Sequence, residues 1–523
     1  MKRYDVIVVG AGPAGLSASI ECASKGMRVG LFDENNRPGG QLFKQIHKFF
    51  GSKEHHAKMR GFKIGIELLE EARKAGVDIH LSSIVTGIFY PMKEIAVSED
   101  GEIKDYRADS IIVATGANEN TLPFKGWTLP GVMGAGAAQT MMNLHGTLPG
   151  KRILMVGSGN VGLVVGFQLL QAGCEVTAVI DAMPKIGGYG VHAAKLARTG
   201  VPFKLGYTIV RAEGTDHVER AVIAKVDEHF QIIEGTEETI EVDTICISVG
   251  LTPMSKLLAM TGCETVNMGG TVPKTNEYGE TSIEGLYAAG DVAGIEEASS
   301  AMVTGRISAI AAAYDAGFMD EESFKREYEE LCEMLSKLRQ GMFSKAMRGK
   351  KISTTQEGYP ISENLLKKGY LLDEEVTNYP GVKEIKGIHP VIECTQNIPC
   401  NPCQEACHFG CIKVGQRITD LPDVACDSDC RNCGNCVASC PGQAIFLVNY
   451  DYDEESATVT LPYEFLPLPE EGTVGKALDR SGKEVCDAQV ISVVTRPAYD
   501  HTNLLTMKVP KEMCMKARFF RIA

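Results

Sequence analysis

Short apolar runs alternate with helix-like segments at the start of the chain. Residues 5–10, DVIVVG, are apolar and mostly β-branched, which is typical of a strand buried in a parallel sheet. Residues 16–26, LSASIECASKG, predict a helix that ends at glycine, and residues 28–33, RVGLFD, predict a second strand. The order strand, helix, strand predicts an α/β fold with a parallel sheet.

The same pattern returns in the middle of the chain. Residues 151–157, KRILMVG, and 174–181, CEVTAVID, predict strands on either side of a helix at 163–173. Further on, residues 319–341 predict a charged amphipathic helix. The stretches 457–465, 488–497 and 503–509 alternate or are β-branched, and they predict a small β-rich region.

Each of the two strand–helix–strand units carries a glycine-rich turn after its first strand. In GAGPAG (10–15), Gly10 allows the tight turn, Gly12 lets the backbone approach a pyrophosphate and Gly15 lets the helix pack on the strand. Pro13 and Ala14 lie in the same turn and are expected at the dinucleotide, and the N-terminus of the helix that follows attracts phosphate. These features predict a dinucleotide site.

An acid at the end of the second strand completes this site. Asp33 is expected to accept the ribose hydroxyls, and its neighbour Glu34 is the alternative.

The second turn, GSGNVG (157–162), repeats the pattern. Asp181 ends the following strand without a nearby arginine, which favours NAD(H) over NADP(H). The alternative is that this domain serves as a scaffold, or binds an adenine nucleotide without hydride transfer. The residues expected at this nucleotide are Gly157, Gly159, Asn160, Val161, Gly162 and Asp181.

Cysteines crowd one segment near the C-terminal end. Ten of the seventeen lie between Cys394 and Cys440, and residues 430–441 have the spacing C-x2-C-x2-C-x3-C-P. In that run the first three cysteines bind one [4Fe–4S] cluster and the fourth binds another. A shift of 33 residues places 400–412 over 433–445, with Cys411 on Ala444, so the sequence predicts two clusters.

The repeat suggests a ligand set for each cluster. Cys394 is expected to supply the missing ligand of the first, with Cys411 as its rival, and Cys426 has no assigned partner. Zinc bound by paired C-x2-C motifs is the alternative. The first cluster would take Cys394, Cys400, Cys403 and Cys440, and the second would take Cys407, Cys430, Cys433 and Cys436.

Composition and charge narrow the function classes. The 67 acidic residues against 53 basic ones give a net charge of −14, which argues against nucleic acid as a partner. No run of eighteen apolar residues is present, so we expect no membrane span. The first strand begins so close to Met1 that we expect no leader peptide and a cytoplasmic protein.

Three further motifs carry a resemblance to a known family. PGGQ (38–41), IIVATGA (111–117) and GLYAAGDVAG (285–294) resemble the two-dinucleotide-domain flavoproteins with the pyridine nucleotide–disulfide reductase-like fold. The resemblance implies FAD, with Asp291 at its ribityl and phosphate region and a helix from about Ala298 to Ala313 aimed at the isoalloxazine. Further residues placed at FAD are Gly40, Gln41, Ala114, Thr115, Gly116 and Gly290.

The family's disulfide reductases carry a C-x2-C or C-x4-C pair facing the flavin. Residues 42–51 contain no cysteine, and the second domain has only Cys174 and Cys246, far apart. We therefore expect neither a thioredoxin reductase nor a glutathione reductase.

The stretches 126–139 and 150–162 are similar to a narrower group, the FAD- and nucleotide-binding large subunits of amine and imino-acid dehydrogenases. That group includes hydrogen cyanide synthase, opine oxidase, sarcosine oxidase and dye-linked L-proline dehydrogenase types. The resemblance implies a hetero-oligomer with a second flavoprotein subunit of D-amino-acid-oxidase type and a small iron–sulfur subunit. The alternatives are a self-sufficient NADH:acceptor oxidoreductase of ferredoxin type, with a small-molecule donor or acceptor, and a scaffold that retains its cofactors.

Together these features predict two Rossmann-like dinucleotide-binding domains, with the NAD domain inserted in the FAD domain. A ferredoxin-like α+β cluster module and a small β-rich C-terminal region follow. The expected segments are 1–120 and 281–318 for the FAD domain, 121–280 for the NAD domain, 319–390 for a helical connector, 391–447 for the cluster module and 448–523 for the β-rich domain.

Overall fold

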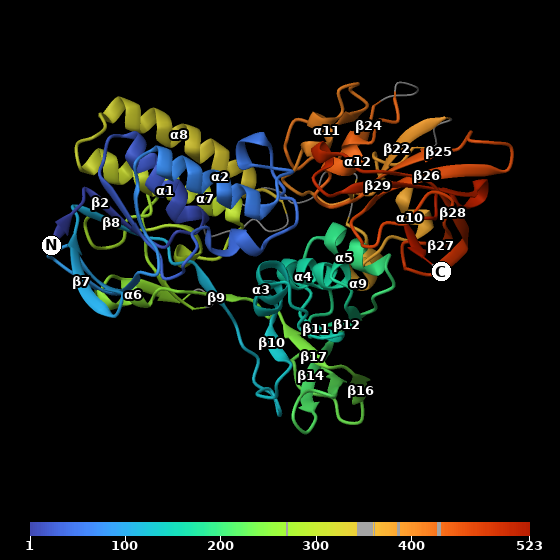
Figure 1. Ribbon diagram of the computed structural model, residues 1–523, viewed down its shortest axis with the longest axis horizontal. Helices are drawn as coiled ribbons and strands as arrows, with labels where there is room; N and C mark the ends of the chain where they lie inside the picture. The colour runs from blue at the N-terminus through green and yellow to red at the C-terminus, as the bar shows by residue number, and fades with distance from the viewer. Residues whose placement is uncertain (268–269, 342–358, 360, 384–386, 426–429, 523) are drawn as a thin grey trace. The chain divides into compact units, whose positions relative to one another are not determined.

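A computed structural model describes residues 1–522 apart from 268–269, 342–358, 360, 384–386 and 426–429 (Figure 1). The chain forms two compact units. Unit 1 comprises Met1–Phe49, Glu54–Asn120 and Leu251–Arg339. Unit 2 comprises Phe50–Lys53, Thr121–Gly250 and Gln340–Ala523.

A five-stranded parallel sheet forms the centre of unit 1. Its order is β21-β8-β2-β3-β4, and all four pairings are parallel. Every residue of β2, β3 and β8 is buried, as their apolar runs predict. The bounds are β2 Val6–Val9, β3 Val29–Phe32, β4 Asp78–His80, β8 Ser110–Val113 and β21 Leu286–Ala288.

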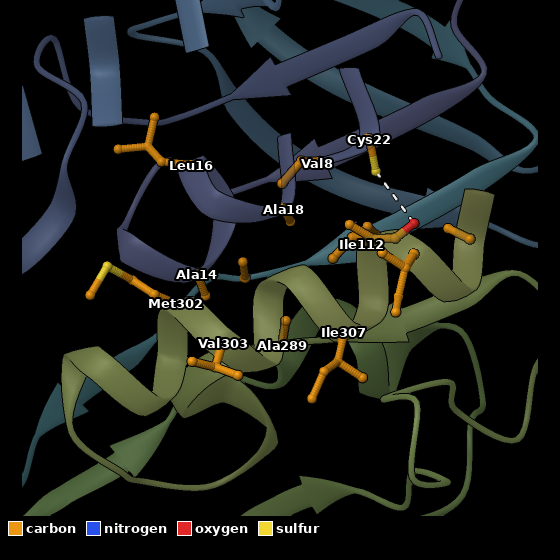
Figure 2. Close-up of a cluster of buried hydrophobic side chains, with 14 of the residues drawn as sticks. Val8, Ala14, Leu16, Ala18, Cys22, Ile112, Ala289, Met302, Val303 and Ile307 are labelled. Atoms are coloured by element: carbon orange, nitrogen blue, oxygen red, sulfur yellow. Dashed lines mark hydrogen bonds between the residues drawn. The ribbon is translucent and has the colours of Figure 1, made fainter. Parts of the chain in front are cut away.

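Helices α1 (Pro13–Ser24) and α7 (Ala298–Asp315) pack closely beside this sheet. Figure 2 shows Leu16 and Cys22 of α1 with Ile307 of α7 in one buried cluster. A side chain at Gly305 would place its Cβ 2.2 Å from the Ala14 carbonyl oxygen, so only glycine permits this approach. Helix α7 agrees with the helix expected at 298–313.

Two further helices extend the same core. Helix α2 (Gly61–Lys74) and helix α8 (Glu321–Leu338) are amphipathic, and α8 confirms the helix predicted at 319–341. Helix α8 buries Phe324, Leu331 and Leu335 in the cluster that contains α1 and α7.

The remaining strands of unit 1 form small sheets. Strand β9 (Ala117–Glu119), where the chain leaves unit 1, pairs with β18 (Leu251–Pro253), where it returns. The others are β1 Lys2–Arg3, β5 Ile84–Phe89, β6 Glu94–Glu99, β7 Glu102–Arg107, β19 Thr265–Asn267 and β20 Thr271–Pro273, with helix α6 Lys256–Met260.

Unit 2 contains a second parallel sheet, in the order β10-β17-β11-β12-β13. Strand β11, helix α4 and strand β12 confirm the predicted second strand–helix–strand unit. The bounds are β10 Val132–Gly134, β11 Arg152–Val156, β12 Glu175–Asp181, β13 Phe203–Leu205 and β17 Thr244–Ile247. The helices are α3 Ala135–His145, α4 Asn160–Gln171 and α5 Gly190–Ala197, and an antiparallel sheet has β14 Tyr207–Glu213, β15 Arg220–Lys225 and β16 Glu238–Glu241.

The rest of unit 2 is built on a seven-stranded antiparallel sheet, β22-β25-β26-β29-β28-β27-β30. Strands β26, β28 and β29 confirm the predicted β-rich region. Strands β22 and β25, which flank the cysteine segment, pair with each other in this same sheet. The bounds are β22 Ile388–Ile392, β25 Ile445–Asn449, β26 Ser456–Tyr463, β27 Val474–Leu478, β28 Glu484–Val494, β29 Asn503–Pro510 and β30 Phe519–Ile522.

Short elements surround the cysteines. Helices α11 and α12 each contain the second cysteine of a repeated C-x2-C segment, Cys403 in α11 and Cys436 in α12. The bounds are α9 Glu363–Lys368, α10 Asp373–Val376, α11 Pro402–Ala406, α12 Asn435–Ser439, β23 Ile412–Lys413 and β24 Asp423–Val424. Within the described residues, no helix has both the length and the apolar character needed to cross a bilayer.

Candidate functional site: two glycine turns and a cysteine repeat

The glycine turn of unit 1 has the geometry expected from its sequence. Gly10 has a φ of 101°, and a Cβ there would lie 2.5 Å from the Ala114 carbonyl oxygen. A Cβ at Gly15 would lie 1.8 Å from the Gly10 carbonyl oxygen. A Cβ at Gly12 would meet no atom within 4 Å, so this position at the start of α1, before Pro13, has room for a ligand.

Asp33 fixes this turn to the end of β3. Its Oδ2 accepts a hydrogen bond from the Ala11 backbone N–H at 2.6 Å, and its Oδ1 accepts from the backbone and the side chain of Asn35. Asp33 is buried, whereas Glu34 is exposed. Asp33 therefore has a structural role in addition to the predicted contact with ribose.

The PGGQ motif lies against the same turn. The Gly39 N–H donates to the Ala11 carbonyl at 2.6 Å, and a Cβ at Gly40 would lie 2.9 Å from the Gly12 Cα. Gln41 is exposed. The segment after Asp33 thus lies beside the predicted pyrophosphate position.

The motifs at 111–117 and 285–294 also lie in this part of unit 1. A Cβ at Gly290 would lie 2.8 Å from the Ala14 Cβ, which places the glycine–aspartate pair beside the start of α1. Gly116 has a φ of 73° and open space around it, and the Thr115 hydroxyl donates to the Met254 carbonyl. The Asp291 carboxylate accepts from the Glu296 N–H at 3.0 Å.

A carboxyl that the sequence did not single out stands at the start of α7. Glu297 is the N-cap residue, yet its side chain makes no capping hydrogen bond. Desolvation by the surrounding protein raises the pKa of the Glu297 carboxyl to about 7, and the charge of Glu296 makes a smaller contribution in the same direction. Only its place next to the G-D motif would have marked it.

The glycine turn of unit 2 repeats this arrangement. Gly157 has a φ of 107°, and a Cβ there would lie 2.0 Å from the Ser248 carbonyl oxygen. A Cβ at Gly162 would lie 2.3 Å from the Gly157 carbonyl oxygen, whereas Gly159 again faces open space. Val161, next to this opening, is exposed.

Asp181 and Asn160 hold the second turn in place. Asp181 Oδ2 accepts from the backbone N–H and the hydroxyl of Ser158 at 2.7 and 2.6 Å. Asn160 Oδ1 accepts from the Tyr189 N–H at 2.8 Å, next to the start of α5. The acid at the end of the second strand therefore binds its own glycine turn in both units.

Four cysteines of unit 2 lie close together in one group. Burial raises the pKa of the Cys400 thiol well above its ordinary value, and the charges of Cys403, Cys440 and Cys394 raise it further. Burial followed by Cys440 and Cys403 has the same effect on the pKa of Cys394. We call these four residues, 394, 400, 403 and 440, group one.

A second set surrounds Cys436. Burial raises the pKa of this thiol well above its ordinary value, and Cys430, Cys407, Cys433 and Cys403 add to the effect in that order. We call residues 407, 430, 433 and 436 group two. A small cavity is lined by all four members of group two and by Cys411.

Backbone N–H groups point at sulfur in both halves of the repeat. The Cys411 N–H donates to Cys407 Sγ at 3.2 Å, and the Ala444 N–H donates to Cys440 Sγ at 3.4 Å. Such donors stabilise a thiolate. Among the residues that the structure describes, no three His, Cys, Asp or Glu side chains are arranged as ligands of a single metal ion. Cys426 lies outside the described residues.

Buried cations next to group one were not expected from the sequence. Helix α5 carries Lys195, whose charge acts to lower the pKa of Cys440, although burial has the larger, opposite effect. Arg198, the C-cap residue of α5, also lies close enough to Cys440 to interact with its charge. These residues are more than 240 positions from Cys440, so no local pattern marks them.

Known proteins are similar to this chain in fold and in the sequence of its first 317 residues. The family model for pyridine nucleotide-disulphide oxidoreductases matches residues 4–317. The crystal structure of T. acidophilum thioredoxin reductase covers 60% of the chain and 99% of its own, with a TM-score of 0.51 and 22% identity, a likeness of fold.

Two curated relatives carry the names of enzyme subunits. An opine oxidase subunit of Rhizobium meliloti is 30% identical over 335 residues, which cover 60% of this chain and 64% of that protein. Hydrogen cyanide synthase subunit HcnB of Pseudomonas aeruginosa is 28% identical and covers 58% and 69%. The chain thus spans less than two thirds of the opine oxidase protein.

The family match covers more than half of the chain, and both glycine turns lie within it. The mixed α/β fold and the resemblance to the two-dinucleotide-domain flavoproteins are thereby confirmed. The chain belongs to the pyridine nucleotide-disulphide oxidoreductase family.

Proposed function

We propose that this chain is the FAD- and iron–sulfur-containing electron-transfer subunit of a heteromeric amino- or imino-acid dehydrogenase that acts on a proline-, sarcosine- or opine-like substrate. The observation that carries the proposal is the arrangement of eight cysteines into two groups of four in a chain with a dinucleotide-type fold. Each group combines cysteines from both halves of the repeat, as two-cluster ferredoxins do.

The cysteine surroundings fit two [4Fe–4S] clusters. A cluster takes one thiolate at each of four irons, so its ligands surround a cube rather than a single ion. Groups one and two each supply four thiols, and backbone N–H groups donate to Cys440 and Cys407. Cys394 lies near Cys440 and Cys403, whereas Cys411 lines the cavity of group two, which supports Cys394 over Cys411 as the fourth ligand of group one.

The two glycine turns fit FAD in unit 1 and NAD(H) in unit 2. Gly12 and Gly159 leave room for a pyrophosphate, and Asp33 and Asp181 lie where ribose hydroxyls are expected. The PGGQ and G-D motifs lie beside the first turn, which supports assigning FAD to unit 1. Bound together, these groups would exchange electron pairs with NAD(H) and single electrons with the clusters.

The names of the relatives support a heteromeric enzyme. The opine oxidase protein and hydrogen cyanide synthase HcnB are each named as one subunit of a larger enzyme. The proposed partners are a second flavoprotein subunit of D-amino-acid-oxidase type, where the substrate is oxidised, and a small iron–sulfur subunit. We place the complex in the cytoplasm.

Two assays test this function. The chain produced alone should reduce a dye with NADH, and Gly159→Val should lower that rate several-fold while the FAD content stays unchanged. Gly12→Val, the matched change in unit 1, should instead lose FAD. Oxidation of proline, sarcosine or an opine should require the second flavoprotein. If the isolated chain reduces ferredoxin with NADH at full rate and has no partner, the self-sufficient oxidoreductase is correct instead.

A further inference from the structure

Unit 2 contains a small cavity that belongs to neither glycine turn. Helix α5, the segment that leads to Cys394, the start of β25 and two C-terminal arginines line it. Its polar lining consists chiefly of Arg198, Arg480, Arg518, Glu393 and Gln396. The family match ends at residue 317, so most of this lining lies outside it.

Three guanidinium groups are buried at this cavity. Arg518 is 1% exposed, and Arg198 and Arg480 are each 6% exposed. Burial lowers the pKa of Arg198 to about 10 and has the same effect on Arg518, so both remain charged at neutral pH. Arg198 and Arg518 both lie against the Phe446 ring, with their guanidinium carbons 5.5 and 4.9 Å from its centroid.

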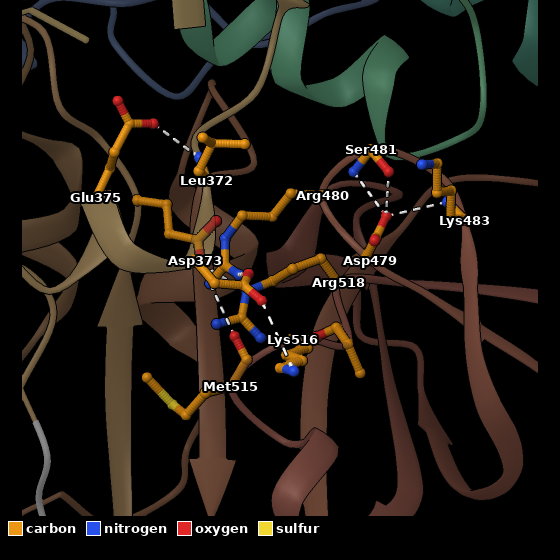
Figure 3. A network of polar contacts seen from close by, with 12 residues as sticks. Leu372, Asp373, Glu375, Asp479, Arg480, Ser481, Lys483, Met515, Lys516 and Arg518 are labelled. Atoms are coloured by element: carbon orange, nitrogen blue, oxygen red, sulfur yellow. Dashed lines mark hydrogen bonds and ion pairs between the residues drawn. The ribbon is translucent and has the colours of Figure 1, made fainter. Parts of the chain in front are cut away.

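The nearby carboxylates do not balance these charges. Glu393 accepts from Arg480 at 2.6 Å and from Arg518 at 2.5 Å. Asp373 accepts from Arg480 at 2.7 Å, but it is half-exposed and also lies 4.0 Å from Lys516 (Figure 3). Among the carboxylates that line the cavity, Glu393 alone is shared by the three buried guanidinium groups, and buried charge is costly without a counterion.

Several donors at the cavity have no partner among the described residues. They are Nε of Arg198, Nε of Arg480, Nη2 of Arg518 and Nε2 of Gln396. Gln396 is 2% exposed, and its Oε1 accepts a hydrogen bond from the Gly190 N–H at 2.6 Å. The amide N–H₂ of Gln396 therefore remains as a donor. Buried donors normally have an acceptor, so this excess indicates an acceptor-rich ligand.

The rest of the lining is largely apolar. Val191, Leu365, Leu371 and the ring of Phe446 contribute to it, together with Tyr370. A ligand with a charged, acceptor-only end and a short apolar body matches both kinds of lining.

From this combination we propose that the cavity binds a small oxyanion, most suitably a short organic carboxylate, between the three arginines and Gln396. The site goes beyond the proposed electron-transfer function and does not rest on it. A carboxylate accepts several N–H bonds and carries no donor, and a phosphate group carries more acceptors than donors, so both complement guanidinium and amide groups. Since Cys394 directly follows Glu393, the ligand would bind close to group one.

Titration calorimetry of the full-length chain tests the site. Acetate, propionate and inorganic phosphate are titrated separately at constant ionic strength, with chloride as the balancing anion. We expect saturable binding with a stoichiometry of one per chain. Tighter binding of acetate or propionate identifies a carboxylate as the ligand, and tighter binding of phosphate identifies a phosphate group. An absence of saturable binding by all three anions overturns the proposal.

Gln396→Glu is the matched variant. It keeps the side-chain oxygen that accepts from Gly190 but replaces the free amide with a carboxylate, which should weaken anion binding by at least about tenfold. Gln489→Glu makes the same change at an exposed position of β28 and should leave the affinity unchanged. Equal affinities in both variants would contradict the proposal. If Gln396→Glu does not fold, Arg198→Met serves as the second variant, and we expect it to lose anion binding.

Discussion

The two halves of the cysteine repeat share a backbone arrangement but differ in their side chains. In each half a backbone N–H four residues after a cysteine donates to its sulfur, from Cys411 to Cys407 and from Ala444 to Cys440. Residue 411 carries a buried thiol, and residue 444 carries only a methyl group. The hydrogen bond to sulfur thus comes from the backbone and does not require a second cysteine.

The surroundings of the two groups differ more than their backbones. Group one lies near the buried cations Lys195 and Arg198. Group two borders a cavity that Phe409 lines, and Phe409 is 49% exposed. Positive charge favours the more negative, reduced state of a cluster, so we expect the cluster of group one to have the higher reduction potential.

Removal of the cysteine that each half of the repeat contributes to the other group gives the largest expected effect. Cys440→Ser should remove the cluster of group one, and Cys407→Ser should remove that of group two, so that each variant retains about four of eight irons. Iron and sulfide analysis with electron paramagnetic resonance (EPR) would show which signal is lost. If both variants lose the same signal, the assignment of these cysteines to different groups is wrong.

Cys394→Ser separates the two candidates for the fourth ligand of group one. We expect this variant to lose much of the cluster bound by group one, because Cys394 lies near Cys440 and Cys403. Iron content and the EPR signal measure the loss. Full retention of both clusters would favour Cys411 instead.

Lys195→Met sharpens the electrostatic difference between the groups. Loss of the buried charge should lower the midpoint potential of the cluster in group one and leave that of group two nearly unchanged. Redox titration followed by EPR gives both potentials. Lys185→Met, at a side chain that is 47% exposed, is the control, and an equal shift in the two variants would argue against a local effect.

Cys411→Ala should have the smallest effect, because it makes the first half resemble the second. The backbone N–H that donates to Cys407 Sγ is retained, so iron content should stay the same as in the wild type. The lost thiol leaves a small cavity that should cost on the order of 1 kcal/mol in unfolding free energy. Chemical denaturation measures this cost, and loss of half the iron would contradict the scheme.

Local patterns were sufficient for the regular parts of the fold. The β-branched runs that form β2 and β11, and the glycine turns that follow them, depend on residues close in sequence. Their spacing alone predicts a parallel strand, a tight turn and a helix start. The cysteine spacing likewise predicts two ligand groups, since the fourth cysteine of a ferredoxin run binds the cluster of the other half, and this assignment stays a prediction.

Contacts between distant segments could not be predicted in this way. Glu393 meets Arg480 and Arg518 across 87 and 125 positions, and no periodic pattern links the three. The sharing of one antiparallel sheet by β22, β25 and the C-terminal strands also depends on tertiary pairing. Spacing could not decide between Cys394 and Cys411 either, because both stand outside the regular repeat.

The most direct test of the account is the metal content and EPR spectrum of the full-length chain purified without oxygen. We predict about eight irons and eight acid-labile sulfides per chain, and signals from two reduced [4Fe–4S] clusters after addition of dithionite. Zinc in place of iron and sulfide, or no paramagnetic signal after reduction, would contradict the account.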